Sequence, residues 1–213
     1  MLNIAFATSS DFTLVIAKNI LQNQGQNLRQ VAIDQATKMG LRVPELDNLE
    51  DFLINLKTIV TQPVKTRKTI STNAITDFAT NNNLELFQPP KINLELKNFS
   101  DFDLDICIVA SFGQLVSAKV LDIPKYGFVN WHPSKLPKYR GASPLQSVIL
   151  SQETESALTW IQMIKEMDAG DIILQIPYQL NQTETFESLA NYNANLGKDT
   201  WAIVLALQIL HKF

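Results

Sequence analysis

Short apolar runs alternate with stretches of helical periodicity over the N-terminal part of the chain. Apolar runs of strand length occur at residues 2–8, 57–61, 84–87, 104–110 and 128–132. Helical patterns lie between them at residues 11–23 and 71–82, and Asp11 is the expected N-cap of the first helix. Strands that alternate with helices predict an α/β domain with a mostly parallel sheet flanked by helices.

The pattern changes beyond residue 150. Two strand-like runs, at residues 157–164 and 171–178, are separated by a short Asp-Ala-Gly-Asp turn and predict a hairpin-like strand pair. Residues 185–213 predict one or two amphipathic helices. Ser143 followed by Pro144 predicts the start of a further helix. Residues 26–55 have some helical periodicity but predict no definite element.

Asn130 and His132 are polar side chains at the end of an apolar run. Side chains two residues apart in a strand point to the same face of the sheet. The amide and the imidazole are therefore aimed together at the place where the strand gives way to a proline turn. Because ligands of open parallel sheets bind at the carboxyl ends of the strands, we expect a site here, lined by the loop through Gly141.

This pair has the chemistry to stabilise an oxyanion and to move a proton at one carbon centre. The Asn130 amide can donate a hydrogen bond to a developing oxyanion, and a protonated His132 can donate a second one. A nearby carboxylate favours the charged imidazolium, and Asp168 in the later turn is the candidate for that role. These residues indicate an acyl-transfer site without identifying the reaction, because each is also common in ordinary loops.

Charge and histidine count narrow the classes of function. The 213 residues suit one domain, and a hydrophobic fraction of 46% can fill its core. The formal net charge of −3 excludes nucleic-acid binding through overall charge, so any such contact needs a local basic patch. The chain has two histidines, and His211 lies in the terminal helical stretch, so we expect no metal site.

The remaining composition indicates a protein of the cytoplasm. The single cysteine, Cys107, lies inside an apolar run and is expected to be a small buried hydrophobe. We find no signal-peptide pattern and no apolar run of membrane-spanning length. We therefore expect a soluble, cytoplasmic, monomeric protein.

Two longer motifs carry a resemblance to a known family. NWHPSKLPKYRGASPLQ at residues 130–146, followed by MDAGD at residues 167–171, resembles the folate-dependent formyltransferases, and within them the branch that acts on methionyl-tRNA. The match covers most of the chain from about residue 57 onward, including TQP at 61–63 and FQPPKI at 87–92. The resemblance implies a Rossmann-like catalytic domain over residues 1–213.

The resemblance also implies a reaction and a set of site residues. The formyl group of 10-formyltetrahydrofolate would pass to the amine of methionine on initiator tRNA through a tetrahedral intermediate. The family's catalytic trio falls on Asn130, His132 and Asp168. Asn130 and His132 would stabilise the oxyanion, and Asp168 would hold His132 charged and help to relay the proton to the departing folate nitrogen. The folate-contacting segment falls on Ser134, Lys135, Leu136 and Pro137.

Other residues indicate which amine accepts the formyl group. A basic loop that would face the tRNA acceptor stem falls on Lys65, Arg67 and Lys68, with Arg140 as a further candidate. The RGASP segment at 140–144 favours the tRNA branch over glycinamide ribonucleotide formyltransferases, whose phosphate loop is rich in glycine where this chain has ATSSDF. The alternatives are sugar-nucleotide or other small-amine N-formyltransferases, formyltetrahydrofolate hydrolases, and a folate-binding domain without turnover.

Two departures from the tRNA branch affect what these residues can do alone. That branch usually carries a C-terminal barrel domain that helps to hold tRNA, and this sequence stops before one. Residues 26–55 look like an insertion between the first helix and the second strand. With a net charge of −3, we expect tRNA binding by these residues alone to be weak and sensitive to salt.

Overall fold

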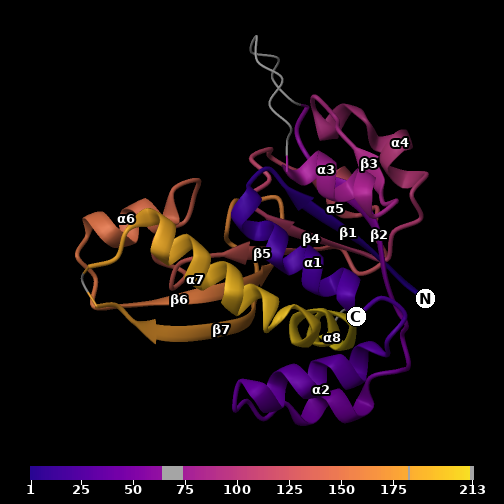
Figure 1. Ribbon diagram of the computed structural model, residues 1–213. Coiled ribbons are helices and arrows are strands. Elements are labelled where there is room, and N and C mark those ends of the chain that lie inside the picture. The colour runs from indigo at the N-terminus through magenta and orange to yellow at the C-terminus, as the bar shows by residue number, and fades with distance from the viewer. Residues whose placement is uncertain (64–73, 182, 212–213) are drawn as a thin grey trace.

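One twisted sheet organises the chain. The computed structural model describes residues 1–63, 74–181 and 183–211 (Figure 1). In this part of the chain a seven-stranded sheet has the order β3-β2-β1-β4-β5-β6-β7. Its strands are β1 (Leu2–Thr8), β2 (Ile54–Val60), β3 (Glu85–Phe87), β4 (Ile106–Ala110), β5 (Phe128–His132), β6 (Glu155–Gln162) and β7 (Ile172–Gln179).

Strand direction divides the sheet into two parts. β3, β2, β1, β4 and β5 are parallel to one another. β6 pairs antiparallel with β5, and β7 pairs antiparallel with β6. The prediction of a mostly parallel sheet followed by a hairpin-like strand pair is therefore confirmed.

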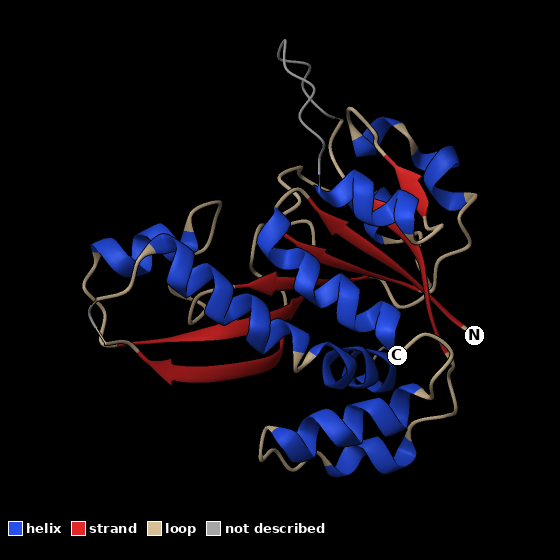
Figure 2. Cartoon of the chain, in the orientation of Figure 1, coloured by secondary structure: helices blue, strands red, loops and turns tan. Residues whose placement is uncertain are grey.

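Helices cover both faces of the parallel part (Figure 2). The buried side chains of β1 alternate between two clusters, with Leu2, Ile4 and Phe6 in one and Ala5 and Ala7 in the other. The first cluster includes side chains of α1 (Leu14–Gln22), α2 (Leu28–Lys38), α3 (Ala74–Asn81), α7 (Phe186–Lys198) and α8 (Trp201–His211). The second includes side chains of the 3-10 turn η3 (Ile92–Leu94), α4 (Leu96–Ser100) and α5 (Ala118–Leu121).

A third, smaller cluster lies beside the antiparallel strands. It joins α6 (Pro144–Leu150), α7 and Tyr178 of β7. In Figure 1 these elements extend away from the body of the molecule. The start of α7 lies at the same end of the sheet as the loop that follows β5, because residues of both line one cavity.

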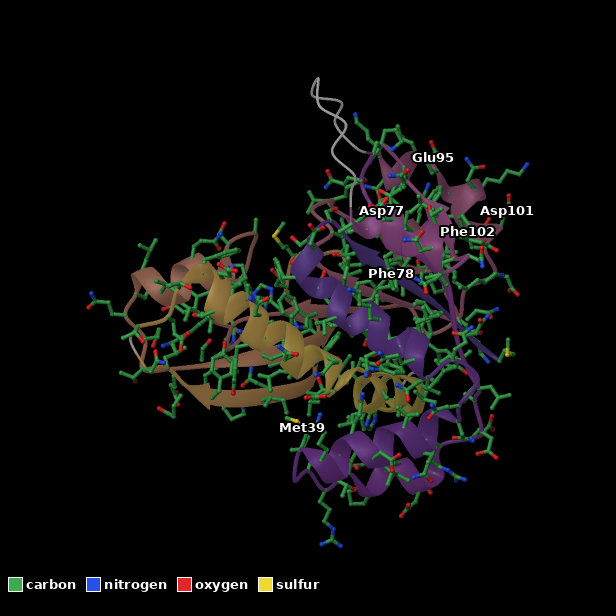
Figure 3. All side chains as sticks on the ribbon, in the orientation of Figure 1. Met39, Asp77, Phe78, Glu95, Asp101 and Phe102 are labelled. Atoms are coloured by element: carbon green, nitrogen blue, oxygen red, sulfur yellow. The ribbon has the colours of Figure 1, made fainter. Side chains whose placement is uncertain are left out.

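α3 is buried on one side. Its Asp77 is exposed while Phe78 is buried (Figure 3). The Phe102 side chain, after α4, packs edge-on against Phe87 of β3 with ring centroids 5.2 Å apart. Such packing fixes the edge of the sheet without polar groups.

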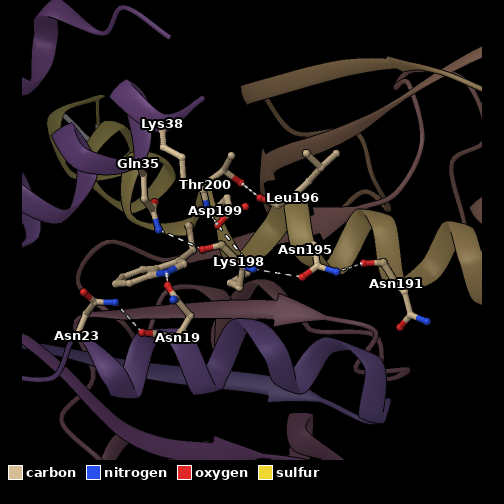
Figure 4. Close-up of polar contacts among 11 residues, drawn as sticks. Asn19, Asn23, Gln35, Lys38, Asn191, Asn195, Leu196, Lys198, Asp199 and Thr200 are labelled. Carbon is tan, nitrogen blue, oxygen red and sulfur yellow. Dashed lines mark hydrogen bonds and ion pairs between the residues drawn. The ribbon is translucent and has the colours of Figure 1, made fainter. Parts of the chain in front are cut away.

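The chain from 26 to 55, which predicted no definite element, is ordered and forms part of the core. It contains α2 and the 3-10 helix η2 (Pro44–Asn48), and both pack against α8. The Gln35 amide of α2 donates to the Lys198 carbonyl at 3.1 Å and accepts from the Ala202 amide at 2.9 Å. Lys38 pairs with Asp199 at 2.7 Å (Figure 4). α2 therefore binds the junction between α7 and α8 through side-chain hydrogen bonds and an ion pair.

The C-terminal stretch forms two helices, and only α7 has one buried face. Every side chain from Trp201 to Gln208 in α8 is buried, so the expectation of an amphipathic helix is wrong there. A helix that is apolar all round needs cover on every side. The sheet covers one side of α8 and α2 covers another, and the sequence pattern of α8 does not reveal this second partner.

Several elements begin at residues other than those predicted. Asp11 does not cap a helix over 11–23, because the chain first makes one 3-10 turn, η1 (Asp11–Thr13), before α1. The Thr13 hydroxyl holds that turn by donating to the Ser10 carbonyl at 2.8 Å. β2 begins at Ile54, three residues before the predicted start at 57. Ser143 does occupy the N-cap of α6, but its side chain makes no capping hydrogen bond.

Two composition-based expectations can be compared with the structure. Cys107 is fully buried in β4, and burial raises the pKa of its thiol well above the ordinary value, as expected of a small core residue. None of the helices in the described ranges is long and apolar enough to cross a membrane.

Candidate active site

A cavity of about 530 Å³ opens at the carboxyl ends of β1, β4 and β5. Its lining comes mainly from the segments that follow these strands, the loop between β6 and β7, and the starts of α6 and α7. The strand order reverses between β1 and β4. Crevices at such switch points are the usual ligand sites of open α/β sheets. Asn130, His132 and Asp168 all line this cavity, as their positions in the sequence predict.

The carboxylate of Asp168 contacts the other two members of the predicted trio. Oδ1 of Asp168 accepts a hydrogen bond from Nδ2 of Asn130 at 3.2 Å. Oδ2 of Asp168 lies 3.6 Å from Nδ1 of His132 and accepts the backbone N–H of Gly141 at 2.8 Å. The Asn130 amide has a second N–H, which remains available to a ligand oxygen. The structure therefore brings together the three side chains that were chosen from residues far apart in the chain.

His132 is held from both sides of its ring. Its side chain is 5% exposed, and Nε2 lies 2.9 Å from the Tyr139 carbonyl oxygen. Both ring nitrogens therefore face oxygen acceptors, the carbonyl at Nε2 and the Asp168 carboxylate at Nδ1. The Nε2 contact is of hydrogen-bond length, whereas Nδ1 and the carboxylate, 3.6 Å apart, form an ion pair when the ring is protonated. With Nε2 occupied by the backbone, Nδ1 is the ring atom that can exchange a proton with a ligand.

The Tyr139 carbonyl is aimed at His132 by an unusual backbone conformation. Tyr139 has φ of +60°, in the left-handed region that non-glycine residues seldom adopt. Its hydroxyl donates to Oε1 of Glu153 at 2.5 Å, and Lys138 pairs with the same carboxylate at 3.0 Å. These two contacts hold the pKa of Glu153 below its ordinary value. The side chain of Tyr139 thus anchors the turn whose carbonyl orients the imidazole.

The turn that carries Asp168 is tightly packed against the backbone of β6. Asp168 has φ of +49°, and Gly170 follows two residues later. A Cβ at Gly170 would lie 1.8 Å from the backbone oxygen of Gln162, so glycine is required for this close approach. The Asp-x-Gly-Asp motif therefore provides the carboxylate and also the turn that returns it to the end of β5.

The segment Ser134–Pro137, expected to contact folate, lies beside the cavity. Among the described residues, those that line the cavity include Pro133 and Gly141 but none from 134 to 137. Ser134 is fully buried, and its hydroxyl donates to the Lys138 carbonyl at 2.8 Å. Thr159 of β6 donates to the Ser134 carbonyl at 2.6 Å, and Lys135 pairs with Glu155. These contacts fasten the loop from β5 to Tyr139 onto β6.

Of the residues expected to bind the acceptor, the structure describes only Arg140. Lys65, Arg67 and Lys68 lie outside the described residues, as 64–73 do. Arg140 is exposed and precedes Gly141, which lines the cavity. Within the described ranges, no group of three or more His, Cys, Asp or Glu side chains could hold a metal ion.

The loop after β4, which the sequence pattern did not single out, forms one wall of the cavity. Gln114 positions it by donating to the Pro89 carbonyl at 2.9 Å and accepting from the Ile92 amide at 2.8 Å. Gln62 donates to the Phe112 carbonyl at 2.9 Å. The TQP and FQPPKI motifs therefore support this wall. The available signal was position alone, because the loop follows a buried strand next to β5 in the sheet.

Comparison with known proteins agrees with this geometry. A family model described as formyl transferase matches residues 1–207. Methionyl-tRNA formyltransferase from Fusobacterium nucleatum is 33% identical over 174 residues, which cover 80% of this chain and 56% of that protein. The enzyme of the same name from Thermotoga neapolitana is 40% identical over 152 residues, covering 68% of this chain and 48% of that protein. The chain thus spans about half the length of these curated relatives.

Solved structures share the fold at lower identity. Phosphoribosylglycinamide formyltransferase from Bacillus halodurans superimposes with a TM-score of 0.70 at 17% identity, covering 100% of this chain and 96% of that chain. A formyltetrahydrofolate deformylase from Pseudomonas syringae gives a TM-score of 0.66 at 15% identity, over 96% of this chain and 59% of that chain. At these identities the likeness supports the fold alone. Because the family model covers nearly the whole sequence, the chain belongs to the formyl transferase family.

Proposed function

We propose that this chain transfers the formyl group of 10-formyltetrahydrofolate to the amino group of methionyl initiator tRNA. The observation that carries the proposal is the single carboxylate of Asp168 in contact with both Asn130 and His132 inside the cavity. The names of the curated relatives support the acceptor, and membership of the formyl transferase family supports the reaction type.

The geometry supports a direct attack without a covalent enzyme intermediate. As the amine nitrogen bonds to the formyl carbon, the carbonyl oxygen gains negative charge. The second N–H of Asn130 and the Nδ1–H of His132 are the donors for that oxyanion. Asp168 balances the charge of the imidazolium. As the bond from carbon to the folate nitrogen breaks, the imidazolium gives its Nδ1 proton to that nitrogen, and the neutral ring, oriented by Asp168, then takes up the proton released by the amine.

The cavity fits a folate-sized donor. Its volume of about 530 Å³ lies in the range of small-molecule sites. Val109, Phe112 and Val116 provide an apolar wall on the face of the sheet toward which Asn130 and His132 point. Direct contact of Ser134, Lys135, Leu136 and Pro137 with the folate stays a prediction. The contacts of that segment with β6 support at least an indirect role, because they position the turn that ends at Gly141.

The direct test is a formyl-transfer assay with several acceptors. The purified chain is mixed at low salt with 10-formyltetrahydrofolate and, in separate reactions, methionyl initiator tRNA, a nucleotide-linked amino sugar, or no amine. We expect formyl-methionyl-tRNA, with a KM for tRNA that rises steeply with salt. Transfer to the amino sugar alone would assign the chain to the small-amine branch. Release of formate without an amine would assign it to the hydrolases, and donor binding without any product would leave a folate-binding domain.

Replacing Lys65, Arg67 and Lys68 together with alanine tests the tRNA-facing loop. Loss of phosphate contacts is expected to raise the KM for tRNA about tenfold and to lower the salt dependence of binding by up to about three units of slope, with the KM for the folate unchanged. The matched control replaces three exposed lysines elsewhere, Lys18, Lys97 and Lys119. Equal effects of the two triple variants on tRNA binding would rule out a specific role of the loop.

A further inference from the structure

The cavity extends to both faces of the sheet at the end of β5. Phe128, Asn130 and His132 alternate with Val129 and Trp131 along the strand, and Phe128 packs in the cluster covered by α4 and α5. Trp131 packs in the opposite cluster, with α1 and α8. The trio is therefore flanked by two lobes. One contains Phe112, Val116 and Met163, and the other lies over Trp131.

The second lobe is built from side chains that the mechanism does not use. We call Phe12, Leu145 and Phe186 the aromatic lobe; all three line the cavity. The Phe12 ring lies 6.0 Å from the Trp131 ring, and the Phe186 ring meets Phe12 edge-on at 6.4 Å. Leu145 is buried in the cluster between α6 and α7. Residues from η1, α6 and α7, which are distant in sequence, thus create one apolar surface beside the trio.

The three segments that build this lobe carry no charged side chain in their described lining, whereas the charged residues of the cavity, Lys165, Glu166 and Asp168, come from the loop between β6 and β7. The lining residues from 10–12, 142–146 and 186 are Ser10, Phe12, Ala142, Pro144, Leu145, Gln146 and Phe186. A phosphorylated sugar acceptor needs cationic or backbone N–H donors where its phosphate binds. An uncharged aromatic surface instead suits an apolar side chain, and a thioether makes favourable contacts with aromatic rings. Phe186 is 46% exposed, so a ligand can reach its ring.

We propose that the aromatic lobe binds the side chain of the aminoacyl acceptor and selects the unbranched thioether of methionine. This inference rests on the proposed function and adds a specificity pocket to it. The donor then occupies the lobe beside Phe112, and the acceptor amine reaches the trio from the aromatic lobe. The two substrates meet at Asn130 and His132 from opposite faces of the sheet.

The test compares one tRNA charged with two amino acids. Initiator tRNA carrying methionine or alanine is assayed with the wild type and with the Phe186→Ala and Phe12→Leu variants. Both variants should lower kcat/KM for the methionyl form about tenfold and leave the alanyl form nearly unchanged, so that the ratio of the two falls about tenfold. Phe186 is half exposed at the first position of α7, so its truncation should cost little stability. Phe12→Leu keeps an apolar side chain but removes the ring.

The matched control is Tyr192→Ala. Tyr192 lies on the same helix, is 47% exposed and packs against Tyr178, and it is not among the described residues that line the cavity. This variant should keep the wild-type ratio. An unchanged ratio in both Phe186→Ala and Phe12→Leu, with an active wild type, would overturn the lobe assignment alone. A wild type that formylates neither charged tRNA would overturn the proposed function and the lobe assignment with it.

Discussion

Replacing His132 with alanine should lower kcat for formyl transfer by about 10²–10³-fold, the usual cost of losing an oxyanion donor. The ring is 5% exposed and fixed between the Tyr139 carbonyl and the Asp168 carboxylate, so its donor position is set before substrate binds. Single-turnover rates at saturating folate and tRNA report the chemical step without the complication of weak tRNA binding. A His132→Ala rate close to that of the wild type would contradict the mechanism.

Replacing Asp168 with asparagine removes the negative charge and so separates the role of the carboxylate from that of the His132 ring. Asp168→Asn keeps the size of the side chain and an oxygen that can accept the Gly141 N–H, but it cannot balance an imidazolium. We expect a loss of about 10²-fold or more. Because the two groups act as one unit, the double variant should lose little more than either single variant. Losses that multiply in the double variant would instead indicate independent roles.

Gly170→Ala should be nearly as damaging although the glycine touches no substrate. The added Cβ would lie 1.8 Å from the oxygen and 2.9 Å from the carbon of the Gln162 backbone, and neither atom can rotate away. The turn must therefore shift, and Asp168 shifts with it. A displacement of about 1 Å at a catalytic group can cost about 10²-fold in rate. We also expect overpacking to cost about 1–3 kcal/mol of stability.

Gly25→Ala is the control for this variant. Gly25 has φ of +77°, and a Cβ added there would have no neighbour within 4 Å. It lies in the turn between α1 and α2, away from the cavity. The variant should lose about 1 kcal/mol of stability through backbone strain and keep its turnover. Thermal unfolding and kcat measured on both variants separate stability from geometry. Wild-type turnover in Gly170→Ala would show that the turn tolerates the shift.

The identity of the trio was accessible from sequence to different degrees. Asn130 and His132 were predictable as a pair, because strand periodicity places residues two apart on one face. Asp168 lies in a separate turn, and it was only a candidate partner for the imidazole until the family motif assigned it to the trio. No local rule predicts that a loop between β6 and β7 returns to the end of β5. The antiparallel pairing of β6 with β5 produces that return.

The polar groups that orient the trio were invisible in the sequence. The Tyr139 carbonyl and the Gly141 amide are backbone groups, which every residue has, and their roles depend on the left-handed turn at Tyr139. The aromatic lobe has the same origin, since Phe12 and Phe186 meet only because α7 packs against η1. The same holds for α8, whose apolar pattern required a cover that residues 28–38 provide.

Hydrophobic periodicity was enough to predict the seven strands, the mostly parallel sheet and the pair Asn130 and His132, because it acts over short distances along the chain. Three features are visible only in the folded chain: Asp168 contacts both members of this pair, the Tyr139 carbonyl orients the imidazole, and both faces of the sheet contribute to one cavity. Those contacts join segments far apart in the chain, and their distances follow from how the elements pack rather than from any local pattern.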